Sequence, residues 1–225
     1  MKFLKKNEKF NIISTENGIA YAKTDLGGKM KQFFRQYSYS IIKMFVNQFA
    51  ISLFGIVLAM ATTAADSTAL TIAFSAFSIV FYLFLLYTMT WEIGAKDRLA
   101  VDYGKQPYRP HTGLILGLIA NVPNLLLAVL YGIAAPFMAT YRWAGNMNAI
   151  LNLLSAILEG MYRGILSVIY LPSGAPILNA WWSYFVIVIP ALIATWLAYF
   201  AGFKNFRMLA AYFNKREQEK KQQSR

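Results

Sequence analysis

Four long apolar stretches alternate with shorter polar segments along the 225-residue chain. Each contains about 20 residues, the length that an α-helix needs to cross a hydrocarbon layer of about 30 Å. We therefore predict an all-α, polytopic membrane protein built as a helical bundle. The predicted spans are residues 42–64, 69–89, 112–137 and 183–203.

A fifth stretch, residues 148–170, is long enough to span but carries Glu159 and Arg163. An ionised side chain at the centre of a span costs about 2.5 to 3.5 kcal/mol on the insertion scale. A crossing here would also separate the C-terminal basic segment from the other basic segments. We therefore favour an amphipathic helix that lies in the outer interface, or re-enters without crossing, and five spans are the alternative.

Basic residues are segregated along the chain. All Lys and Arg residues except Arg142 and Arg163 lie within residues 1–43, 91–111 and 204–225. Basic residues near the ends of spans are retained in the cytoplasm, so we predict a plasma-membrane protein with both termini cytoplasmic. The formal charge of +12 would then face anionic lipid headgroups, each contact contributing about 1 kcal/mol. This distribution does not favour a nucleic-acid partner.

The two terminal segments are predicted to be cytoplasmic. Residues 1–40 form a basic tail that ends in a pre-membrane helix, and residues 204–225 form a basic helical tail. Asn17-Gly18 between short apolar runs is a hairpin signal, with a flexible tail as the alternative. The first twenty residues contain no apolar core of about 7 to 15 residues, so a removable signal peptide is not expected.

Polar side chains recur every three or four residues along the predicted helix 148–170, and therefore share one face. Three explanations remain open. The stripe faces water on an interfacial helix, or it is buried with Glu159 and Arg163 neutralising each other, or it lines the path of a solute or ion. We favour the first. The stripe consists of Asn148, Asn152, Ser155, Glu159, Arg163 and Ser167.

The span 112–137 carries a face of small and amide side chains around Pro123. The proline removes a backbone hydrogen bond and predicts a kink. Small residues are typical of close helix packing, whereas free carbonyls at a broken helix coordinate ions in some transporters. The face consists of Gly113, Gly117, Asn121, Asn124, Ala128 and Gly132. The candidate intramembrane polar site combines Asn121, Asn124, Asn152, Ser155, Glu159 and Arg163.

The first two spans also carry one polar or small face each, which predicts a compact bundle. These faces are expected to contact neighbouring helices rather than lipid. They consist of Gln48, Ser52, Gly55, Ala59 and Thr62 on the first span, and of Thr71, Ser75, Ser78 and Tyr82 on the second.

The sequence offers little catalytic or metal-binding chemistry. It contains no cysteine, and a lone His111 is a poor metal ligand, so we predict no catalytic, cofactor or metal site. In the loop 91–111, Glu92 and Lys96 have the spacing of a helical ion pair. The candidate contacts for an anion or lipid in this loop are Lys96, Arg98, Lys105 and Arg109.

Two functions therefore remain. The first, which we favour, is a non-enzymatic membrane component that engages anionic lipids, a protein partner or a second copy of itself through its basic segments. The second is a small transporter or channel subunit with a polar path between the spans.

Overall fold

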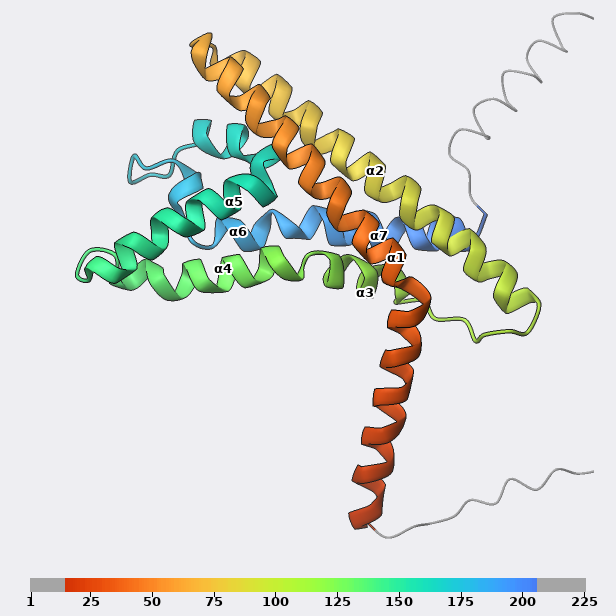
Figure 1. Cartoon of the computed structure of the whole chain (residues 1–225). Helices are drawn as coiled ribbons and strands as arrows, with labels where there is room; N and C mark the ends of the chain where they lie inside the picture. The colour runs from red at the N-terminus through yellow and green to blue at the C-terminus, as the bar shows by residue number, and fades with distance from the viewer. Residues whose placement is uncertain (1–14, 206–225) are drawn as a thin grey trace, which may run out of the picture. The chain divides into compact units, whose positions relative to one another are not determined.

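The computed structural model describes residues 15–205, and it describes side-chain surroundings from residue 27 onward except at residue 29. The chain divides into two units, Met1–Tyr39 and Ser40–Arg225, which are considered separately. Every named element of the described chain is helical, which confirms the all-α prediction (Figure 1). In chain order the elements are α1 (Thr15–Ala64), α2 (Thr68–Asp102), α3 (Thr112–Ala120), α4 (Val122–Ala134), η1 (Ala135–Phe137), α5 (Arg142–Val168), η2 (Ile177–Asn179), α6 (Ser183–Val186) and α7 (Val188–Phe203).

Four of the described helices are long and apolar enough to cross a membrane. They are α1 from Met30 onward, α2, α5, and α6 with α7 taken as one helix. The bent pair that α3 forms with α4 and η1 is a fifth candidate, with a bend of 57°. The observed ends at Ala64, Phe137 and Phe203 agree with the predicted spans. The chain is therefore a helical bundle of the membrane-protein type.

The hairpin predicted at Asn17-Gly18 is wrong, because α1 begins at Thr15 and continues through both residues. A helix satisfies its backbone hydrogen bonds within one segment, whereas a lone two-stranded hairpin is only marginally stable. The residues that precede Thr15, and the predicted tail beyond Asn205, lie outside the described part of the chain.

The bundle from Ser40 onward has polar side chains inside and large apolar side chains outside. Val57, Val80 and Leu126 are each more than half exposed. This pattern fits a lipid environment, in which helices associate through close packing and hydrogen bonds. The predicted inward faces of the first two spans are confirmed except at half-buried Ala59. Their buried members are Gln48, Ser52, Gly55, Thr62, Thr71, Ser75, Ser78 and Tyr82.

Helices α2 and α7 cross with their backbones in direct contact at two glycines. A Cβ atom at Gly94 would lie 2.2 Å from the carbonyl oxygen of Tyr199. A Cβ atom at Gly202 would lie 2.0 Å from the carbonyl oxygen of Trp91. Only residues without a side chain allow this approach.

The kink predicted at Pro123 is present, between the end of α3 and the start of α4. Proline cannot donate the hydrogen bond that would continue the helix. At the bend, both the backbone amide and the side-chain amide of Asn121 donate to the carbonyl oxygen of Gly117, over 3.0 and 2.9 Å. Before the bend, Gly113 and Gly117 lie against α7, as the small face predicted.

Helix α5 changes direction at Glu159, where the backbone leaves the helical region with φ −129° and ψ 17° (Figure 1). The Nη1 atom of Arg163 donates a 3.4 Å hydrogen bond to the carbonyl oxygen of Asn152, across 11 residues. In a straight helix these residues would lie about 16 Å apart along the axis, beyond the reach of an arginine side chain. The first arm (residues 142–158) and the second arm (residues 160–168) therefore fold back on each other.

Both arms of α5 reach the end of the bundle that carries the α1–α2 turn, which we call the turn end. In the first arm, Asn152 makes a side-chain hydrogen bond with Tyr131, near the end of α4. The arm then runs inward until it contacts Gln48, about 24 Å from the end of α1. In the second arm, Gly164 lies against Ser75, near the start of α2. Helix α5 thus enters from the turn end and returns to it.

Candidate functional site

Two polar side chains of α1 form hydrogen bonds with the backbone at the turn in α5. Gln48 donates from Nε2 to the carbonyl oxygen of Leu158 over 3.1 Å. Ser52 donates to the carbonyl oxygen of Ala156 over 3.3 Å, and its Oγ accepts a hydrogen bond from the amide of Gly160. Backbone groups that lose their helical partners need such replacements inside a membrane. The inward face of α1 therefore stabilises the break.

Small residues allow α1 to reach this backbone. A Cβ atom at Gly160 would lie 2.6 Å from the carbonyl oxygen of Ser52, and one at Gly55 would lie 2.5 Å from the Cα atom of Met161. The turn of α5 is therefore pressed against the middle of α1. This contact fixes the depth at which Glu159 sits in the bundle.

Glu159 is only 3% exposed. Within the described residues, neither of its carboxyl oxygens accepts or donates a hydrogen bond. Three tyrosines lie near it, Tyr82, Tyr162 and Tyr184. An isolated buried carboxylate is costly unless a cation or a proton compensates it.

A small cavity of about 10 Å³ borders Glu159. This volume is about that of one water-sized probe, the least that holds a water molecule. Its polar lining comes from Ser155, Glu159, Arg163 and Tyr184, and its apolar lining from Leu166, Leu178 and Ile187. Both arms of α5 therefore border one small space, and η2 and the α6–α7 segment contribute the rest of its lining.

A chain of side chains connects the turn in α5 with the bend between α3 and α4. The hydroxyl of Tyr82 donates to Oε1 of Gln48 over 3.3 Å and lies near the side chain of Asn121. Asn124 donates from Nδ2 to Oδ1 of Asn121 over 3.0 Å, while its own Oδ1 has no partner among the described atoms. The two broken helices therefore meet at Tyr82.

The predicted polar stripe lies largely inside the bundle. Ser155 and Glu159 are buried, so the interpretation of an interfacial helix with a water-facing stripe is wrong. The second arm contacts Ser52 of α1 through Gly160 and Ser75 of α2 through Gly164. An ion pair between Glu159 and Arg163 is absent from the described contacts, since Arg163 turns back to Asn152. The burial of Ser155 and Glu159 agrees with the second explanation, whereas mutual neutralisation by an ion pair is not among the described contacts.

The six residues of the predicted intramembrane site lie in two separate groups. Asn121 and Asn124 form the group at the α3–α4 bend, and the other four lie on the two arms of α5. Asn152 bonds Asn148 and Tyr131, and Ser155 contacts the hydroxyl of Tyr184 over 3.5 Å. Sequence reasoning did not place Tyr82 and Tyr184 near Glu159, because they belong to other helices and no spacing rule relates them to α5.

The basic residues of the loop 91–111 are partly occupied by local partners. The predicted ion pair is confirmed, with Nζ of Lys96 2.8 Å from Oε1 of Glu92. Arg98 lies 3.6 Å from Asp102, and Lys105 lies over the ring of Tyr103. Arg109 is half-buried. Their proposed contact with an anion or lipid stays a prediction.

Asp97 in the same segment is buried, with its Oδ2 accepting a 2.9 Å hydrogen bond from the hydroxyl of Tyr199 on α7. Asp97 falls within the loop predicted at residues 91–111. Helix α2 extends beyond the predicted span to Asp102, and this extension places Asp97 against α7.

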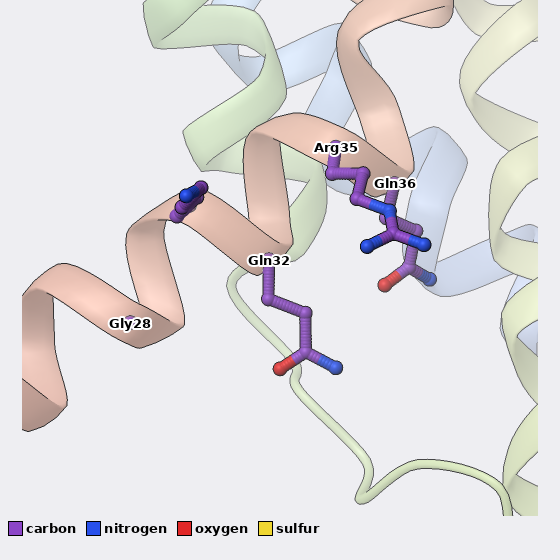
Figure 2. A pocket seen from close by; sticks show the side chains of 5 residues that line it. Gly28, Gln32, Arg35 and Gln36 are labelled. Atoms are coloured by element: carbon purple, nitrogen blue, oxygen red, sulfur yellow. The ribbon is translucent and has the colours of Figure 1, made fainter.

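In the first unit, a surface hollow of about 530 Å³ lies along α1. Figure 2 shows the side chains of Gln32, Arg35 and Gln36 extending from this helix around it. Gly28 and Lys31 complete the described lining. Its basic and amide side chains have the chemistry of an anion contact.

These features define the class of the protein. It is an all-α bundle of helices able to cross a membrane, with one break at the α3–α4 bend and another at the buried Glu159. The chain matches no protein-family model, no curated protein and no solved structure with which it was compared. The function is therefore inferred from the site alone.

Proposed function

We propose that the protein moves a small cation across the plasma membrane, along a path between the α3–α4 bend and the turn of α5. Both termini would lie in the cytoplasm, and α5 would re-enter from the outer side. The observation that carries this proposal is Glu159, a buried carboxyl group without a hydrogen-bond partner among the described residues. Ionisable residues at membrane depth commonly mark ion pathways.

The geometry of the backbone supports the same proposal. Broken helices occur at membrane depth where they are buried in protein or line a cavity. In several transporters, two discontinuous helices meet at the binding site. Here the break at Asn121 and the break at Glu159 are joined through Tyr82 and Gln48. A packing role alone explains the glycines but not the unpartnered carboxyl group.

The test is an ion-flux measurement on purified protein in liposomes. We expect wild-type protein to accelerate the decay of at least one imposed gradient of H⁺, Na⁺ or K⁺. Glu159→Gln is expected to reduce that rate by about 100-fold, the lower end of what a positioned proton-transfer group contributes. Glu92→Gln is the matched control, because it makes the same chemical change at an exposed carboxylate.

The second candidate function is the engagement of anionic lipid through basic segments, which the hollow along α1 favours. The same experiment separates the two functions. If wild-type protein moves none of the three ions faster than protein-free liposomes, the transport proposal fails and the lipid-engaging role becomes the better explanation.

A further inference from the structure

Within the proposed transport function, on which this inference rests, we propose that the transported cation is a proton and that Glu159 binds it.

The cavity beside Glu159 has too little room for a hydrated metal cation and too few oxygen ligands for a dehydrated one. Its volume of about 10 Å³ accommodates about one water molecule. Metal cations that leave water need several oxygen ligands in place of their hydration shell. Three of the seven lining residues are Leu166, Leu178 and Ile187. The described residues also contain no group of three or more acidic, histidine or cysteine side chains that could hold a metal.

The hydroxyl groups of the wall already have partners. Ser155 donates to the carbonyl oxygen of Asn152 over 3.0 Å. Tyr184 lies 3.3 Å from the carbonyl oxygen of Leu178, to which it donates. The carboxyl group of Glu159 is thus the polar group of this cavity that has no partner in the described structure.

The charge around the cavity opposes a metal cation. Arg163 borders the same space, and its guanidinium group carries a fixed positive charge. A metal ion beside Glu159 would be repelled by this charge at close range in a medium of low dielectric constant. A proton on the carboxyl group makes Glu159 neutral and leaves Arg163 as the single charge of the cavity wall.

The neighbours of Glu159 single it out as the group that exchanges protons. The titratable and charged groups that face it are Tyr82 from α2, Tyr162 and Arg163 from α5, and Tyr184 from α6. The described neighbours from α1 are Gln48 and Ser52, which do not titrate. Tyrosine and arginine ordinarily titrate at about pH 10 or above. A proton taken up by a carboxyl oxygen of Glu159 is released to water on the other side of the membrane.

The experiment uses full-length protein in liposomes that contain a pH-sensitive dye, with a K⁺ gradient and valinomycin to set the membrane potential. We expect potential-driven proton uptake with wild-type protein and with Glu92→Gln. We expect uptake close to that of protein-free liposomes with Glu159→Gln, and partial activity with Glu159→Asp, which keeps the carboxyl group. Isotopic Na⁺ uptake is measured in parallel and is expected to stay at background.

Each outcome distinguishes the inference from the proposed function. Na⁺ or K⁺ flux that depends on Glu159, without proton flux, would overturn the proton assignment while leaving the transport function intact. Absence of flux for all three ions would reject both. Proton flux that survives in Glu159→Gln would keep transport and remove Glu159 from its path. Thermal unfolding of each variant in detergent verifies that a loss of flux does not reflect a loss of fold.

Discussion

Gly202→Ala is expected to destabilise the bundle by about 3 kcal/mol or more, at or above the upper end of what overpacking usually costs. The added Cβ atom would lie 2.0 Å from the carbonyl oxygen of Trp91 and 2.9 Å from its Cα atom. Both atoms belong to the backbone of α2, so no side-chain rotation can relieve the clash. The helices must separate, and the contact between α2 and α7 must be rebuilt.

The measurement is thermal unfolding of the detergent-solubilised protein, monitored as the fraction of protein that remains monodisperse. Gly145→Ala is the matched control, because a Cβ atom at Gly145 of α5 would have no neighbour within 4 Å. Alanine favours a helix over glycine by about 0.8 to 1.0 kcal/mol, so this control should be neutral or stabilising. Equal stabilities of the two variants would contradict the close crossing of α2 and α7.

Glu159→Met is expected to stabilise the protein while abolishing flux. Burying a polar group without a hydrogen bond costs about 1 to 3 kcal/mol in mutational data, and Glu159 has no such bond among the described contacts. Methionine adapts its shape to an irregular site. The expected gain is therefore about 1 to 3 kcal/mol in the free energy of unfolding.

Gln48→Leu also replaces a buried polar side chain by an apolar one, but it is expected to destabilise the protein. Gln48 is buried, but it donates to the carbonyl oxygen of Leu158 and accepts from Tyr82. Its replacement leaves both partners unpaired and should cost about 1 to 3 kcal/mol. Chemical denaturation of both variants measures whether each substitution raises or lowers the free energy of unfolding. Destabilisation by Glu159→Met would show that Glu159 is a packing residue rather than a functional one.

Much of the bundle was predictable because the lipid environment imposes simple rules on a sequence. Helices that cross a membrane must be long and apolar, and the limits of the apolar stretches predicted helix ends at Ala64, Phe137 and Phe203. Helices must also approach closely, which identified the glycine face of α3. Proline acts on its own helix, so the kink at Pro123 followed from local sequence alone.

The turn in α5 was not predictable in the same way. No proline lies near Glu159, and its local sequence continues a helical pattern. The break depends on hydrogen bonds from Gln48 and Ser52, more than a hundred residues earlier in the chain. The even polar stripe gave no signal of this break, so the sequence predicted an amphipathic or re-entrant helix without locating its turn. The buried contact of Asp97 with Tyr199 was missed for the same reason, since it joins distant segments.

The decisive measurement concerns the two ends of α5. The chain has no cysteine, so Thr140→Cys and Ser173→Cys each introduce a single thiol at an exposed position that flanks this helix. We predict that a membrane-impermeant thiol reagent labels both variants in intact cells, and labels Ser224→Cys only after permeabilisation. Labelling of Thr140→Cys without Ser173→Cys, together with labelling of Ser224→Cys in intact cells, would show that α5 crosses the membrane and would contradict a re-entrant site at Glu159.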